Sequence, residues 1–227
     1  MKLFTEILNF ILPRECTGCE NILTDEIAPF CSVCYSSFQM PTADEIKTHF
    51  MTNFYDDGFI SHFISLYKFE ASAPIQKVIH SFKYQQRYKV ALYMGLLMGK
   101  ELFRQQTFPK IDFIVPLPLH PVRLADRGFN QAEYLCRGIS PIIKAPVLPR
   151  LIKRVVNTVT QTSLNVKQRK KNVAGAFKVK KGIQIKDKVI LLVDDVKTTG
   201  ATINECACEL MKFGPSKIIA ATLAVVK

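Results

Sequence analysis

The hydrophobic pattern of the chain divides it into two kinds of element after about residue 60. Alternating apolar positions predict a strand over residues 61 to 69, and helical spacing predicts helices over residues 71 to 80 and 90 to 105. From residue 111 onward the pattern predicts strand, helix, strand, basic segment, strand, helix and strand. This alternation predicts an α/β fold with a mostly parallel, doubly wound sheet.

One apolar run stands out because acids and hydroxyl residues follow it directly. Residues 189 to 193 are typical of a strand buried on both faces, so Asp194 and Asp195 should emerge at its carboxyl end, where open α/β sheets bind ligands. Small residues from Thr198 to Thr202 lead into an expected helix, whose N-terminus favours a phosphate. Carboxylates repel phosphate but accept hydrogen bonds from sugar hydroxyls. The pattern therefore predicts a ribose 5-phosphate site; a plain acidic strand end with a Thr-rich helix cap is the alternative.

Four of the seven cysteines form two C-x-x-C pairs, Cys16 with Cys19 and Cys31 with Cys34. Each pair places two thiolates on one tight turn, and two such turns complete the tetrahedral shell of a structural Zn²⁺. Redox-active dithiols or disulfides are the alternative, which an oxidising compartment would favour. The other three cysteines lack metal-like spacing, and we expect them to be small buried residues on helices.

Charge is distributed unevenly within the net +12 of the 227 residues. Residues 150–188 contain twelve Lys and Arg against a single acid, which leaves +11, whereas residues 1–50 contain three basic and seven acidic residues. A concentrated basic stretch favours a polyanionic partner such as pyrophosphate or nucleic acid, although a merely solvated charged segment has the same composition.

The chain length allows one good-sized domain and a small appendage. We expect a zinc-binding module and linker over residues 1–50 and the α/β domain over residues 51–227, with residues 35–58 as an irregular linker. No apolar run is long enough to cross a bilayer. Residues 3 to 12 fit an amphipathic helix, and the lack of a secretion signal predicts a cytoplasmic protein with no membrane insertion.

The acid pair and its turn closely resemble the phosphoribosyl pyrophosphate (PRPP) signature of type I phosphoribosyltransferases. The matching residues are Asp194, Asp195, Val196, Thr198, Thr199, Gly200, Ala201 and Thr202. Lys197 departs from the pattern, which has an apolar or aromatic residue at that point.

Further motifs resemble the ComF/GntX family of phosphoribosyltransferase-like proteins, which is linked in bacteria to natural competence. The strand at residues 111–115 is followed by Pro116-Leu117-Pro118, and after eight residues by Arg127-Gly128-Phe129-Asn130-Gln131. The cysteine pairs, the segment Phe82-Lys83-Tyr84 and the spaced residues Arg154, Gln161, Arg169 and Asn172 agree with the same family. The resemblance covers nearly the whole chain.

The resemblance implies a type I phosphoribosyltransferase fold that binds PRPP with Mg²⁺. Pro116, Leu117 and Pro118 would form the pyrophosphate loop, in which the N–H groups of Leu117 and Leu119 face the leaving group. Arg154, Gln161 and Arg169 would belong to a flexible catalytic loop.

The family also implies a role in DNA uptake and transformation, with partners that include single-stranded DNA and a competence helicase. Four residues of the basic segment are the candidate DNA contacts: Lys167, Arg169, Lys170 and Lys171. Two roles remain open, a phosphoribosyltransferase with an unknown acceptor and a non-catalytic PRPP sensor or scaffold for DNA-processing partners.

Overall fold

The computed structural model describes residues 14–23, 28–71, 73–84, 87–105, 109–156, 173–180 and 182–226. The amphipathic helix expected over residues 3–12 lies outside these ranges. None of the helices within them is long and apolar enough to cross a membrane.

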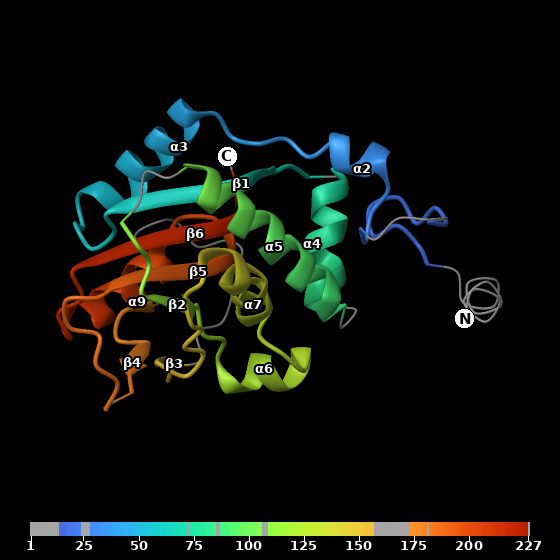
Figure 1. Cartoon of the computed structure of the whole chain (residues 1–227). Coiled ribbons are helices and arrows are strands. Elements are labelled where there is room, and N and C mark those ends of the chain that lie inside the picture. The colour runs from blue at the N-terminus through green and yellow to red at the C-terminus, as the bar shows by residue number, and fades with distance from the viewer. Residues whose placement is uncertain are drawn as a thin grey trace.

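A four-stranded sheet forms the centre of the molecule (Figure 1), in the order β1-β6-β5-β2. The strands are β1 (His62–Phe69), β2 (Phe113–Pro116), β5 (Val189–Lys197) and β6 (Lys217–Val226). All neighbours pair in parallel. The prediction of a mostly parallel sheet is confirmed. The apolar run at the start of β5 is buried, as expected for a strand covered by helices on both faces of the sheet.

Helices cover the two faces of this sheet, so the fold is doubly wound (Figure 1). On one face lie α4 (Pro74–Tyr84), α5 (Tyr88–Gln105) and α7 (Gln131–Ile143), whose apolar side chains share one core cluster with the cysteine-rich segment. The second cluster contains α9 (Ala201–Met211) on the other face. The helices predicted over residues 71–80 and 90–105 correspond to α4 and α5.

Helices α5 and α7 approach each other through glycine. A Cβ added at Gly138 would lie 2.2 Å from the carbonyl oxygen of Leu92, and one at Gly95 would lie 2.2 Å from the carbonyl oxygen of Leu135. No side chain fits at such a distance, so glycine permits this backbone contact.

The region from residue 117 to residue 180 differs from the predicted order. Two helices, α6 (Pro121–Arg127) and α7, replace the single expected helix, because Gly128 ends α6 with φ 77° and Asn130 caps α7. The strands β3 (Ile152–Arg154) and β4 (Phe177–Val179) pair with each other in a separate antiparallel sheet and do not extend the main one.

The expected irregular linker over residues 35–58 is largely helical, which corrects that prediction. After the short α2 (Ser32–Ser36), α3 (Ala43–Phe50) continues directly into a π-helical turn, η1 (Met51–Tyr55). Thr42 and Glu45 form a capping box that starts α3, a local signal that the sequence carries. The domain boundary expected after residue 50 falls inside this continuous segment, which lies along the edge strand β1 (Figure 1).

Candidate functional site

The acid pair lies in the C-terminal half of β5, which continues to Lys197, whereas the sequence predicted a strand that ends at residue 193. The backbone N–H of Asp195 donates to Oδ1 of Asp194 at 2.8 Å. Asp195 also forms an ion pair with Lys83 at the end of α4, with 3.0 Å between Oδ2 and Nζ. Both partners of this ion pair are largely shielded from solvent. The two acids of β5 therefore lie beside a cation that comes from another element, α4.

Electrostatics distinguish the two carboxylates. Burial and the neighbouring charge of Asp195 raise the pKa of Asp194 to about 7, against the opposing effects of the Asp195 N–H, Lys83 and Arg154. A carboxylate that changes protonation near neutral pH is typical of a functional site.

Arg154 is the second cation close enough to influence Asp194. It ends β3, and its guanidinium carbon lies 5.6 Å from the centre of the Phe177 ring on the paired strand β4. Burial lowers the pKa of Arg154, and the nearby charge of Arg123 acts in the same direction, whereas Asp194 opposes them. Lys83 and Arg154 thus bring positive charge to the acids from two different elements.

The turn after β5 leads directly into the N-terminus of α9. Gly200 adopts the left-handed conformation with φ 73° at the N-cap of α9, and the helix begins at Ala201. The first N–H groups of a helix lack intrahelical partners and lie at the positive end of its dipole. The backbone from Thr198 to Thr202 can therefore hold an anion.

Lys197, the residue that departs from the PRPP pattern, is buried with only 2% of its surface exposed. Its Nζ lies 3.2 Å from Nδ1 of His49 on α3 and 5.8 Å from the centre of the Phe63 ring. Burial lowers the pKa of Lys197 to about 8. The lysine therefore fills an apolar position with its stem and contacts a helix outside the sheet.

The predicted pyrophosphate loop follows β2, beside β5, but one assigned donor is already engaged. The N–H of Leu117 donates to the carbonyl of Val193 at 2.8 Å, which extends the sheet pairing of Pro116 with Val193. Leu117 is therefore not a free donor, which corrects the prediction from the sequence, and Pro118 has no N–H. Of the proposed donors, the N–H of Leu119 is the one that remains.

The motif from Arg127 to Gln131 builds the turn between α6 and α7. The Arg127 guanidinium donates to Oε1 of Gln131 at 3.0 Å. The Asn130 side chain accepts from the N–H of Ala132 and donates to the carbonyl of Leu117 at 3.0 Å. Asn130 thereby fixes the start of α7 against the loop after β2, while Phe129 packs on Tyr88 and Tyr134.

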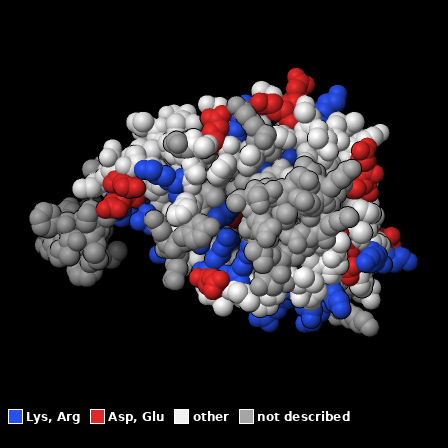
Figure 2. Space-filling view, turned by 180° about the vertical axis from the view of Figure 1, so that it is seen from behind, with Lys and Arg blue, Asp and Glu red and all other residues white. Residues whose placement is uncertain are grey.

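Several predicted residues lie outside the described ranges. These are Gln161, Asn172 and the candidate DNA contacts Lys167, Arg169, Lys170 and Lys171. The described chain ends at residue 156 after β3 and resumes at residue 173 before β4, and the two strands pair at Arg154 and Phe177. From behind, Lys and Arg line the lower edge of the surface in Figure 2.

The four cysteines of the two C-x-x-C pairs come together, with their sulfur atoms all within 4.8 Å of one another. The Sγ atoms of Cys19 and Cys31 lie 3.7 Å apart. A tetrahedral Zn²⁺ with bonds of about 2.3 Å requires about 3.8 Å between its sulfur ligands, whereas a disulfide requires about 2.05 Å. All four cysteines are free thiols, and the cluster could hold a metal ion.

Backbone donors make Cys16 a good thiolate. The N–H groups of Cys31 and Gly18 point to its Sγ at 3.2 and 3.4 Å. Burial alone would raise the pKa of Cys16, but these donors and Cys19 together lower it to about 6. Burial of the neighbouring Cys34 raises its pKa. The remaining Cys136 and Cys206 are fully buried on α7 and α9, and Cys208 is partly exposed.

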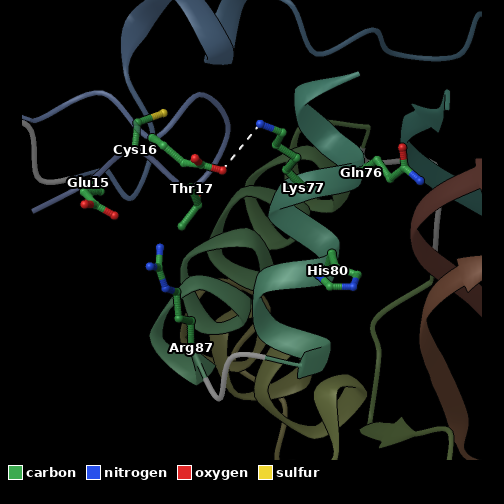
Figure 3. Close-up of a pocket in the computed structure, with 8 residues that line it drawn as sticks. Glu15, Cys16, Thr17, Gln76, Lys77, His80 and Arg87 are labelled. Atoms are coloured by element: carbon green, nitrogen blue, oxygen red, sulfur yellow. Dashed lines mark hydrogen bonds and ion pairs between the residues drawn. The ribbon is translucent and has the colours of Figure 1, made fainter. Parts of the chain in front are cut away.

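A cavity of about 330 Å³ separates the cysteine cluster from α4 (Figure 3). Charges of both signs line it: Glu15 and Glu20 on the cysteine side, and Lys77 with Arg87 on the other. Lys77 pairs with Glu20 at 3.5 Å, and Arg87 points toward Glu15 in Figure 3. The cavity therefore lies within a polar interface between the cysteine-rich segment and the helices.

Comparison with known proteins agrees with the fold. Residues 145–226 match the model of the phosphoribosyl transferase domain. Competence protein F of Haemophilus influenzae is 30% identical over 220 residues, 89% of this chain and 86% of that protein. Competence protein ComFC of Streptococcus pneumoniae is 29% identical over 203 residues, 88% of this chain and 77% of that protein. DNA utilization protein YhgH of Escherichia coli is 33% identical over 148 residues, 64% of each protein.

The fold and the matched domain together define a phosphoribosyltransferase-like protein. Within that class, the near full-length similarity to Competence protein F shows that the chain belongs to the ComF family.

Some residues around the site were not assigned a role from the sequence. Lys83 was noted only as part of a family segment, and nothing in its local pattern indicates that the end of α4 reaches Asp195. His49 and Asn204 gave no signal, because their partners are 148 and 151 residues away along the chain. These contacts form only because the fold places α3 and the turn after it against the edge of the sheet.

Proposed function

We propose that this protein binds PRPP with Mg²⁺ at the end of β5 and acts in natural competence and DNA uptake. One observation carries the ligand: a carboxylate pair near the end of a buried strand is followed, after a short turn, by a helix N-terminus, and Lys83 and Arg154 bring positive charge to the pair. Acids suited to sugar hydroxyls and a cradle suited to a phosphate then occur in the order in which ribose 5-phosphate would need them.

In the bound state each group of the site has a separate task. Asp194 and Asp195 would accept hydrogen bonds from the two ribose hydroxyls, and the backbone from Thr198 to Thr202 would hold the 5-phosphate. Lys83 and Arg154 would face the pyrophosphate, and Gln161 with Arg169 would add polar groups from the loop predicted to close on it. The carboxylates are the hard oxygen donors that suit a magnesium-bound ligand, and Mg²⁺ would neutralise charge on the pyrophosphate.

As an enzyme, the protein would transfer the ribose 5-phosphate group to an acceptor. The acceptor's lone pair would form a bond to the anomeric carbon while the bond to pyrophosphate breaks, and pyrophosphate would leave with the electron pair. The positive charge of Lys83 and Arg154 suits this leaving group. The same groups would equally serve a PRPP sensor or scaffold without transfer, and a screen for pyrophosphate release over bases, amines and DNA separates the two roles.

The competence role is supported by the names of the relatives and by the basic segment. Competence protein F and ComFC match most of the chain, and residues 150–188 carry +11. We propose weak, salt-dependent contact with single-stranded DNA through Lys167, Arg169, Lys170 and Lys171, with a competence helicase as a further partner. A titration of labelled DNA at increasing salt tests this part, and the absence of binding at low ionic strength would contradict it.

We further propose one structural Zn²⁺ at Cys16, Cys19, Cys31 and Cys34. The mutual distances of the sulfur atoms and the backbone donors to Cys16 support four thiolate ligands in a closed site. Zinc here would stabilise the fold and take no part in chemistry, because four thiolates leave no open position.

Calorimetry with Mg²⁺ and PRPP tests the central proposal. The Asp195→Ala variant should bind at least about tenfold more weakly, since a hydrogen bond to a charged group is worth about 1.5–3 kcal/mol. The Asp194→Ala/Asp195→Ala variant should lose more, whereas Asp44→Ala/Glu209→Ala removes the same charge from other helices and should bind like the wild type. Equal affinity in the wild type and the Asp194/Asp195 variant would refute the site.

A further inference from the structure

The segment from His49 to Asp57 contacts residues 197 to 204, which include the proposed phosphate cradle and are called the phosphate loop below, at three points. We call this segment, which spans the end of α3 and the η1 turn, the brace. His49 meets Lys197, Phe54 lies under Gly200, and Asn53 with Asp57 binds Asn204. The contacted residues bracket the turn between β5 and α9, so the brace touches Gly200 within the proposed phosphate cradle and one residue on either side of it.

Asn204 makes the most specific of these contacts. Its Nδ2 donates to the carbonyl of Asn53 at 2.6 Å and to Oδ2 of Asp57 at 2.7 Å. Because both partners accept hydrogen bonds, the amide nitrogen must face them, which fixes the orientation of the carboxamide. Asn204 is 6% exposed, and its Oδ1 is buried without a partner in the described structure. The two bonds to the brace thus hold a polar side chain that burial disfavours.

Phe54 fills the space beneath the loop. It is 1% exposed, packs on Phe63 of β1, and leaves no room for a side chain at Gly200, where a Cβ would lie 2.9 Å from the ring. Gly200 also needs its left-handed φ of 73° to start α9. The Phe54 ring and the left-handed backbone therefore both require glycine at position 200.

We propose that the brace preorganises the phosphate loop for the 5-phosphate of its ligand, with Asn204 as the positioning residue that connects the two. This rests on the proposed function, because the ligand is the one assigned there. A loop that is already held in its binding geometry loses less conformational freedom when the phosphate arrives, so affinity is higher. All three contacts lie between Lys197 and Asn204, on the 5-phosphate side of the site.

Because these contacts lie on the 5-phosphate side, changing Asn204 should weaken ligands that carry the 5-phosphate and spare ligands that lack it. The probes are ribose 5-phosphate, Mg²⁺–PRPP and Mg²⁺–pyrophosphate, each titrated by calorimetry into the full-length protein. Asn204→Ala should weaken the first two about tenfold, because the released loop must be ordered again when the phosphate binds, and should leave pyrophosphate unchanged. Glu209→Ala is the matched control, since it removes an ion pair with Lys212 from the far end of the same helix.

A rescue experiment separates positioning from general stability. Asn204→Asp replaces the donor by an acceptor that repels Asp57, and should weaken ribose 5-phosphate at least as much as Asn204→Ala. Adding Asp57→Asn supplies a new donor on the brace and should restore part of the affinity. An equal loss for all three ligands, or no rescue, would show that Asn204 only stabilises the fold and would overturn the proposal.

Hydrogen exchange distinguishes this proposal from the proposed function. Amides of residues 198–202 should exchange faster in ligand-free Asn204→Ala than in the wild type or Glu209→Ala. If the wild type binds none of the three probes, the proposed function fails, while faster exchange still supports the brace. Unchanged exchange overturns the brace whatever the ligand results are.

Discussion

The cysteine-rich segment and the sheet site hold their functional groups in opposite ways. In the cysteine-rich segment Cys16 and Cys34 lie in the buried core cluster with Leu23 and Phe30, and Cys19 and Cys31 pack against it, so the groups that could bind metal also hold the segment together. At the end of β5 the acids stand on a strand whose apolar residues form the core without them. Substituting one of the cysteines should therefore unfold the cysteine-rich segment, whereas substituting one of the acids should leave the sheet intact.

The largest expected effect comes from breaking the cysteine cluster. Cys34→Ser should abolish binding of about one Zn²⁺ per chain and make residues 14–38 sensitive to protease, because structural zinc contributes about 10 kcal/mol or more to such sites. Elemental analysis and limited proteolysis measure both effects. Cys208→Ser, on α9, should change neither. Full metal content and protease resistance in Cys34→Ser would show that the thiols are not the basis of this segment's stability.

A second variant tests whether the sheet domain depends on its own packing. Gly138→Ala would place a Cβ 2.2 Å from the Leu92 carbonyl, so α5 and α7 must separate, at a cost of about 3 kcal/mol or more. At Gly99 the closest atom is 3.1 Å from an added Cβ, and the loss in Gly99→Ala should be smaller. Denaturant unfolding measures both, and metal content should stay unchanged. Equal losses would contradict a packing origin.

The two regions also differed in how far the sequence predicted them. The cysteine spacing and the β5 run specified local geometry, because a C-x-x-C turn and a buried strand end are set by residues close in the chain. Leu117 was misassigned because the sheet pairing that uses its N–H depends on β5, more than 70 residues away. The contacts of Lys83 and Asn204 likewise depend on tertiary placement that no local pattern contains.

The smallest expected effect concerns Lys197 at the end of β5, which is 2% exposed. Burial lowers its pKa to about 8 from the 10.5 of an exposed lysine, so its protonated form destabilises the native state below pH 8. Between pH 8 and 10.5 the unfolded chain binds more protons than the native one, and stability rises with pH. Lys197→Met keeps the stem and removes this titration.

The difference in unfolding free energy between wild type and Lys197→Met isolates this residue, because the other titrating groups are common to both proteins. The variant should be more stable by about 2 kcal/mol at pH 7.5, and its advantage should shrink toward pH 10 as native Lys197 becomes neutral. The pKa of His49, lowered by burial and by the Lys197 charge, lies below this window. Denaturant unfolding from pH 7.5 to 10 measures the effect. A difference that stays constant with pH would mean that Lys197 keeps an ordinary pKa, and the sheet site would then tolerate a buried charge at no electrostatic cost.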